Sequence, residues 1–226
     1  MISEKQIPSP SRLVESLRDT GYSHQAAFAD IVDNCIAANA TNITIDISQD
    51  FMGNDVSVAF YDNGDGMSVD ELKNAMRYGS DKRPSPKSLG KFGMGLKTAS
   101  TSFCRRLSVI SIKNKIPSIR VWDIDEIIDQ DEWILLEPNL DEYSDYLEKL
   151  EALTDGCGTV VIWTRVDRLI INNGTDYIQK AMDTIIAEIS QHLSATFGKF
   201  LIGIDNFNNT KADEYTNPEV TIMLND

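Results

Sequence analysis

Strand-like segments follow one another directly in pairs along this chain, and long helical segments separate the pairs. Alternating or β-prone residues predict strands over 42–47 and 56–61, and again over 107–113 and 118–123. Antiparallel hairpins mixed with long helices are typical of a two-layer α/β sandwich and not of a doubly wound parallel sheet. We therefore expect one sheet built largely from hairpins, with helices packed on it.

Helix signals place the remaining regular elements. Ser23 and Ser68 are suitable N-cap residues for helices that run to about residue 39 and about residue 78. The segment 79–95 is rich in Gly, Ser, Pro and Lys, and we expect a mobile loop there. Composition and apolar spacing predict the other helices over 11–19, 94–103, 140–153 and 175–200, and further strands over 159–165 and 219–224.

The last predicted strand, 219–224, is followed only by Asn225 and Asp226. A single strand buries little surface and has to pair with other strands to be stable. We therefore expect residues 206–226 to be the start of a following domain of a longer protein, and residues 1–205 to form the main domain.

The chain of 226 residues is acidic, with a formal net charge of −14. An acidic domain repels phosphate backbones, so we expect nucleic acid to be contacted only through domains missing from this chain. The cysteines Cys35, Cys104 and Cys157 lack the spacing of a zinc site, which indicates reduced intracellular thiols. Neither a signal peptide nor an apolar run of about 20 residues is present, so we expect a cytoplasmic protein without membrane contact.

Polar residues interrupt the apolar face of the helix that follows Ser23. Asp30 and Asn34 are four residues apart and lie on the same side of the helix, with Asp33 beside them. A carboxylate in this place could orient and deprotonate water, while the amide oxygen of Asn34 could ligate Mg²⁺. Taken alone, the helix fits a solvated polar edge equally well.

A second pattern, from Asp62 to Met67, follows the strand 56–61. Asp62 could accept a hydrogen bond from an exocyclic amine such as that of adenine, and Gly64 and Gly66 could let the base approach the backbone. The same residues also fit an ordinary turn.

The third pattern is a glycine-rich segment that leads into the helix 94–103. Gly90, Gly93 and Gly95 gather free backbone N–H groups at a helix start, and Lys91 and Lys97 add positive charge. This arrangement could hold a polyphosphate. The P-loop, dinucleotide-binding and protein-kinase glycine patterns are absent. A fourth pattern, Gly158-Thr159, stands at the start of a β-prone strand and also fits simple β-propensity.

These four patterns, in this order, resemble the Bergerat ATP-binding fold of the GHKL superfamily, which takes in gyrase B, the ninety-kilodalton heat-shock chaperones, histidine kinases and MutL. The resemblance covers about residues 11–205 and is closest in style to the MORC and heat-shock chaperone branch. It implies an α+β fold, a two-layer sandwich whose mixed, mostly antiparallel sheet is covered by helices on one face.

The resemblance implies ATP and Mg²⁺ as ligands. Asn34 is implied as the magnesium ligand, and Asp62 as the acceptor for the adenine amine, aided by Thr159 through water. Gly66 would allow close contact with the base. Asp30 stands where the family has its catalytic glutamate. The nucleotide-binding set also includes Gly64 and Met67.

The glycine-rich segment is implied to close over the phosphates. Residues 79–95 would form the lid, with backbone N–H groups of Gly93, Met94 and Gly95 bound to phosphate oxygens. Lys97 is implied as a further phosphate contact, and Lys91 belongs to the same nucleotide-binding set.

Two departures from the family pattern concern hydrolysis. Asp30 is one methylene shorter than glutamate, about 1.5 Å of reach, and a misplacement of that size can lower a rate on the order of 100-fold. Ala37 stands where many relatives have aspartate. If Asp30 is merely short, D30E would speed turnover; if the pocket is matched to aspartate, the rate would fall.

The resemblance implies a slow magnesium-dependent ATPase that converts ATP to ADP and drives closure of an ATP-dependent homodimer in a longer protein. A following transducer domain would contribute a lysine that this chain lacks. A DNA-directed or phage-defence role is an association by family. Two alternatives stay open: an ATP-sensing module without appreciable turnover, and a histidine-kinase catalytic domain, for which His24 and His192 are poor phosphoacceptor candidates.

Overall fold

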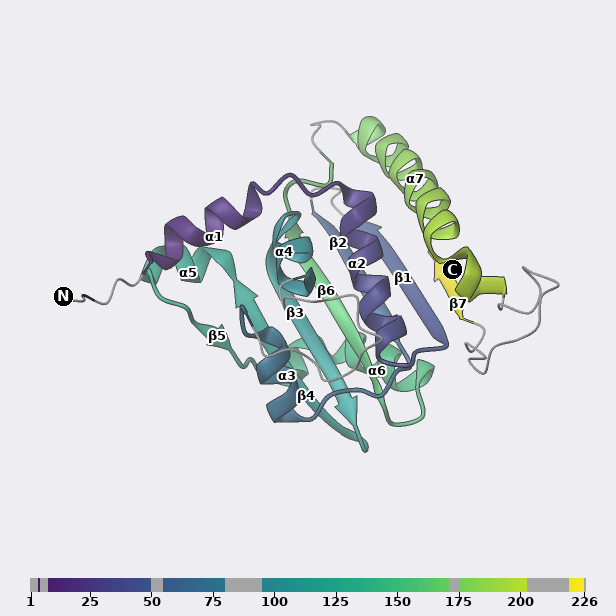
Figure 1. The fold of residues 1–226 in the computed structure, drawn as a ribbon, viewed down its shortest axis with the longest axis horizontal. Coiled ribbons are helices and arrows are strands. Elements are labelled where there is room, and N and C mark those ends of the chain that lie inside the picture. The colour runs from purple at the N-terminus through teal and green to yellow at the C-terminus, as the bar shows by residue number, and fades with distance from the viewer. Residues whose placement is uncertain are drawn as a thin grey trace.

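A seven-stranded sheet forms the centre of the fold in this computed structural model (Figure 1), which describes residues 4, 8–49, 55–79, 95–170, 175–202 and 220–225. Across the sheet the strand order is β5-β4-β3-β6-β2-β1-β7. The strands are β1 (Asn42–Gln49), β2 (Val56–Asp62), β3 (Cys104–Lys113), β4 (Ile116–Asp123), β5 (Leu135–Leu136), β6 (Gly158–Val166) and β7 (Thr221–Leu224).

The sheet is mixed and mostly antiparallel, as expected. The hairpins β1–β2 and β3–β4 pair antiparallel, and β6 pairs antiparallel with both β2 and β3. Within the described residues, the parallel pair is β1 with β7. The register places Thr159 of β6 opposite Asp62 on one side and opposite Ser111 on the other. The insertion of β6 thus brings distant parts of the chain together at one end of the sheet.

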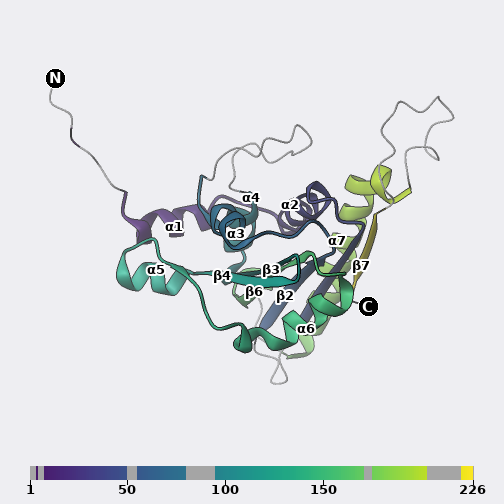
Figure 2. The same ribbon diagram turned by 90° about the horizontal axis from the view of Figure 1, so that it is seen from below.

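Helices cover one face of the sheet, and a shorter helical segment covers part of the other. Figure 2 shows α2, α3 and α4 over one face and α6 over the opposite face. The predicted two-layer α+β fold is confirmed, with α6 and the preceding 3₁₀ turn as an addition. The helices are α1 (Pro10–Arg18), α2 (His24–Ala37), α3 (Val69–Met76), α4 (Gly95–Thr101), α5 (Ile124–Gln130), η1 (Leu140–Tyr143), α6 (Ser144–Leu153) and α7 (Thr175–Ile202).

Side-chain caps fix the starts of the helices that carry polar motifs. The Ser23 hydroxyl accepts a hydrogen bond from the backbone N–H of Ala26 and caps α2, as its position predicts. Ser68 and Glu71 form a reciprocal capping box at the start of α3. Helix α5 is absent from the expected elements, although the Asp123 side chain caps it.

Aromatic rings fill the core between the sheet and α2. Phe28, Phe60 and Trp163 are fully buried, and their ring centroids lie 4.9–5.3 Å apart. On the other face, a second apolar cluster joins Tyr143 and Leu150 to the sheet. Burial of this kind is the main favourable contribution to folding, and the two clusters hold both helical layers on the strands.

The strand expected to start a following domain is part of this same sheet. β7 lies along β1, and the Asn225 side-chain oxygen accepts a hydrogen bond from the backbone N–H of Ile47 at 2.6 Å. The division into residues 1–205 and 206–226 stays a prediction. No helix in the described part of the chain is both long and apolar enough to cross a membrane.

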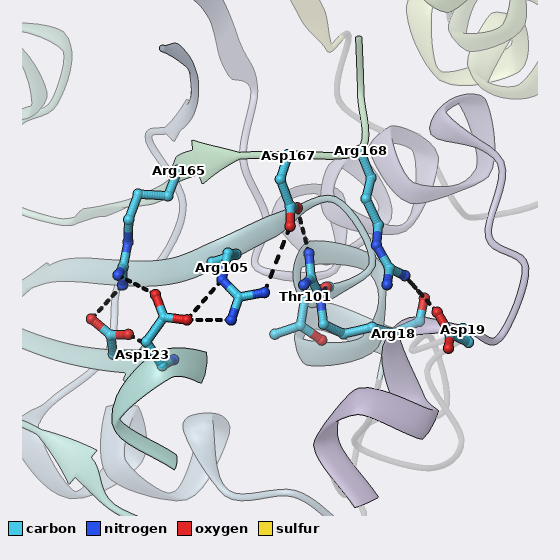
Figure 3. A network of polar contacts seen from close by, with 9 residues as sticks. Arg18, Asp19, Thr101, Arg105, Asp123, Arg165, Asp167 and Arg168 are labelled. Carbon is cyan, nitrogen blue, oxygen red and sulfur yellow. Dashed lines mark hydrogen bonds and ion pairs between the residues drawn. The ribbon is translucent and has the colours of Figure 1, made fainter. Parts of the chain in front are cut away.

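A network of ion pairs fastens α1 to the end of the sheet (Figure 3). Arg18 is buried, donates from Nε to the Thr101 carbonyl at 2.8 Å, and pairs with Asp167. Arg168 donates to the Asp19 carboxylate and to the Arg18 carbonyl, both at 2.8 Å. The C-terminal end of α1 and the turn that follows it are therefore held by the segment after β6.

The same network continues toward α5. Arg105 and Arg165 both pair with Asp125, and Arg165 also pairs with Asp123. Arg105 additionally lies 3.8 Å from a carboxylate oxygen of Asp167, which joins the two halves of the network. Charge-assisted contacts among several groups hold geometry better than isolated surface pairs do.

Candidate functional site

Asp62 ends β2 with its carboxylate buried; the residue is 5% exposed. The carboxylate accepts hydrogen bonds from the backbone N–H of Gly64 at 2.9 Å, from the backbone of Thr159 and from the Cys35 thiol. Burial nevertheless raises the pKa of Asp62 from 3.8 to about 6, because desolvation of the carboxylate outweighs these donors. The sequence prediction places an acceptor here, and the structure gives it a buried, fixed position.

Gly64 and Gly66 shape the turn after Asp62. A Cβ at Gly64 would lie 2.6 Å from the Ala38 carbonyl oxygen, and a Cβ at Gly66 would lie 1.9 Å from the Ile112 carbonyl oxygen. Gly66 also has a φ of +62°, which favours glycine. Close packing of the protein backbone thus accounts for glycine at both positions, and the predicted approach of a ligand to them stays a prediction.

Ser111 links the turn to β6. Its hydroxyl accepts a hydrogen bond from the backbone N–H of Met67 at 2.8 Å and lies 2.9 Å from the Thr159 hydroxyl. Met67 and Thr159 are predicted site residues, whereas Ser111 is not among them. The sequence feature that could have indicated Ser111 is a polar residue among apolar ones in β3, a strand whose residues are buried on both faces of the sheet.

Asp30, Asp33 and Asn34 lie together on α2, and Asp30 lies beside the start of α4. The Asn34 amide nitrogen donates to the Asp30 backbone carbonyl at 2.7 Å, which leaves its Oδ1 as the atom that can accept a further partner. The pKa of Asp33 is raised by burial and then by the negative charge of Asp30. The Tyr22 hydroxyl donates to Asp30 Oδ2 at 2.7 Å.

The donors at this place fit a metal ion carried by a nucleotide. No cluster of three or more His, Cys, Asp or Glu side chains suited to a metal occurs in the part of the chain that the structure describes. Mg²⁺ commonly takes one or two protein ligands and completes its shell with phosphates and water. A single amide oxygen from Asn34 is compatible with that mode of binding.

Helix α4 begins beside Asp30 and buries its lysine. A Cβ at Gly95 would lie 3.5 Å from Asp30 Oδ2, so the first residue of α4 lies next to the carboxylate. Lys97 is 1% exposed, and its ammonium donates to the Ala75 carbonyl at 2.7 Å near the end of α3. Cations favour the carbonyl end of a helix. Lys97 therefore fastens α4 to α3, and its predicted phosphate contact stays a prediction.

The rest of the predicted phosphate-binding segment falls outside the described residues. This applies to Lys91, Gly93 and Met94, and to residues 80–94 of the predicted lid. A hollow of about 380 Å³ is lined by Asn63, by residues 152–155 and by Cys157. Since it contains none of the predicted site residues, we assign it no part in the site.

Comparison with known proteins agrees with this geometry. The family model described as "Histidine kinase-, DNA gyrase B-, and HSP90-like ATPase" matches residues 22–159, which contain Asp30, Asn34 and Asp62 and end at Thr159. The chain is also 35% identical over 78 residues to ATPase MORC2B of Mus musculus; this match covers 33% of the chain and 8% of that protein. The chain thus belongs to the histidine kinase-, DNA gyrase B- and HSP90-like family of ATPases.

Proposed function

We propose that this domain binds ATP together with Mg²⁺ and hydrolyses it slowly to ADP and phosphate. The observation that carries the proposal is the buried carboxylate of Asp62, held by donors from β6 and α2 at the end of the central sheet. A buried acceptor beside a glycine turn, in a family of ATPases, is suited to recognising the amine edge of adenine.

Adenine and metal would be held by different elements. Asp62 would accept a hydrogen bond from the exocyclic amine, with Thr159 completing the contact through water. Asn34 Oδ1 would ligate the Mg²⁺ that neutralises charge on the phosphates. The N-terminal end of α4 at Gly95 and the lid residues would face the phosphate chain.

Asp30 would act as the general base for hydrolysis. A water oxygen bonds to the γ-phosphorus while the bond from that phosphorus to the β,γ-bridging oxygen breaks, and ADP leaves. The proton released by the water passes to the Asp30 carboxylate. Catalysis then depends on how accurately Asp30 and the γ-phosphate hold the water between them.

The wider role rests on family association. The chain spans 8% of the length of the mouse ATPase that it matches, so activities of a whole protein are proposals for this one. We propose a cytoplasmic ATPase module whose nucleotide cycle closes a homodimer in a larger protein with a DNA-directed or phage-defence role. The net charge of −14 favours DNA contact by other domains.

Calorimetric titration with a non-hydrolysable ATP analogue tests the binding. Saturable binding that requires Mg²⁺ and is lost with a GTP analogue is the expected result. D62N is the matched variant, because it keeps the shape of the side chain and removes its charge. Absence of binding to the full-length protein at millimolar analogue would refute the proposal.

A second candidate is an ATP sensor that binds without turnover. The Asp30 side chain, one methylene shorter than glutamate, favours this candidate, because it restricts the reach of the carboxylate toward a water at the γ-phosphate. Phosphate release measured under single-turnover conditions separates the two functions, since a sensor would bind the analogue equally well and release no phosphate.

A further inference from the structure

The Tyr22 hydroxyl occupies the space between α2 and α4. It donates to Asp30 Oδ2 at 2.7 Å on α2, and it accepts a hydrogen bond from the Thr98 hydroxyl on α4. Burial first, and the neighbouring Asp30 carboxylate next, raise the pKa of Tyr22. The phenol therefore keeps its proton and remains a donor throughout the neutral range.

Both sides of Tyr22 are held in place along the chain. Before it, Arg168 binds the Asp19 carboxylate (Figure 3), and Gly21 adopts a φ of +76° to make the turn. After it, Ser23 caps α2. The ring itself packs against the main apolar core. The hydroxyl is thus fixed before any ligand arrives, which is the condition for a group that orients another.

The contact divides the two oxygens of Asp30 between two tasks. Oδ2 accepts the Tyr22 hydroxyl and lies beside the first residue of α4, where a Cβ at Gly95 would be 3.5 Å away. Asp33 is the charged neighbour of Asp30 on the same helix, and repulsion between the two carboxylates contributes to the raised pKa of Asp33. The contact of Oδ2 with Tyr22 leaves Oδ1 as the oxygen that would take a proton from water.

We infer that Tyr22 is a positioning residue that fixes Asp30 for proton transfer and matches the site to aspartate in place of glutamate. This inference rests on the proposed ATP hydrolysis. A glutamate at position 30 would carry its carboxylate about 1.5 Å further along the side chain and away from the Tyr22 hydroxyl. The length of the aspartate side chain therefore suits its hydrogen bond with Tyr22. D30E should break that bond and lower turnover.

Y22F tests the inference because it removes the hydroxyl and keeps the ring. The expected result is a 10- to 100-fold loss in kcat, with the Kd of the ATP analogue changed less than about twofold. Y146F is the matched control: Tyr146 is half-buried, its hydroxyl bonds Ser57, and it packs with the second apolar cluster. Y146F should leave both kcat and Kd unchanged.

Thermal unfolding of the nucleotide-free protein tests the hydrogen bond between Tyr22 and Asp30 directly. Thermal unfolding of Y22F, D30A and the double variant forms a double-mutant cycle. If the hydroxyl acts through Asp30, Y22F lowers the melting temperature in the wild-type background and has a smaller effect in D30A. Equal effects in both backgrounds would overturn the inference. If Y22F fails to fold, T98V serves instead, since it removes the donor to the Tyr22 oxygen and is expected to lower kcat by a smaller factor.

The outcomes separate the inference from the function on which it rests. A wild-type protein that binds no analogue overturns the proposed ATP binding, and the unfolding cycle still decides the Tyr22–Asp30 contact. A wild type that binds the analogue and releases no phosphate overturns hydrolysis and the role of Tyr22 in it. A wild type that turns over ATP, with Y22F unchanged in kcat or D30E faster, overturns the positioning role alone.

Discussion

Replacing Asp62 with asparagine is expected to remove a pH-dependent loss of stability in the nucleotide-free protein and, at the same time, to remove adenine selectivity. The carboxylate is buried, and its pKa in the folded protein is about 6 compared with 3.8 in the free side chain. A pKa difference of about 2 corresponds to about 3 kcal/mol. This is the free energy by which the buried, ionised carboxylate destabilises the folded state. Asparagine does not ionise, so this contribution is absent from D62N.

The sign of the pH dependence follows from proton binding. Below pH 3.8 both folded and unfolded chains hold the proton on Asp62, and its contribution to stability is complete. Between about pH 4 and pH 6 the unfolded chain releases the proton first, so the free energy of unfolding of the wild type falls as pH rises. Above pH 6 both states are ionised and the loss is complete.

Urea unfolding from pH 5 to pH 8 measures this effect, with the lower limit set by the sequence pI near 4.5. The stability of D62N relative to wild type should increase across this range by about half of the 3 kcal/mol. D129N, which neutralises an exposed carboxylate of α5, should give a curve parallel to wild type. Parallel curves for D62N and wild type would refute the reasoning, and full retention of ATP-over-GTP preference would refute the adenine assignment.

Three further substitutions test separate parts of the structure. N34A should abolish magnesium-dependent ATP binding in calorimetry, and unchanged affinity would remove Asn34 from the site. G66A should destabilise the fold by about 2 kcal/mol more than G79A, because both glycines have positive φ but only the first has a carbonyl oxygen in the way; equal losses would contradict the steric argument. R18Q should cost about 2 kcal/mol in chemical denaturation, whereas R168Q, with an exposed partner, should change stability by less than about 0.5 kcal/mol.

Local sequence patterns predict most of the helices and strands, because the signals for these elements lie within a few residues. Ser68 and Glu71 mark the start of α3 through a reciprocal cap, and Ser23 marks the start of α2. The same type of signal marks α5, where Asp123 caps an Ile-rich helix that is absent from the expected elements. The position of β6 between β2 and β3 depends on packing across the whole sheet, which no short pattern encodes.

For the candidate site, the sequence indicates Asp62 at the end of a strand as a possible acceptor, and the structure adds that its carboxylate is buried; its role toward adenine stays a prediction. Tyr22 was not predictable, because it precedes α2 and meets Asp30 through a turn and not through helical spacing. Lys97 shows what a charge pattern leaves out. Its charge predicts a phosphate contact, which stays a prediction; the sequence does not indicate that the carbonyl groups at the end of α3 also offer the ammonium a partner inside the protein.

The central place of β6 has a consequence for synthesis on the ribosome. β2 and β3 each hydrogen-bond to β6, so the two hairpins made earlier remain separate until residues 158–166 have emerged. Until then each hairpin exposes a row of unpaired main-chain groups, which can pair with other chains. The nascent protein is therefore most vulnerable to aggregation shortly before β6 is complete, and a chain cut short there would lack both a continuous sheet and the partner that Asp62 finds in Thr159.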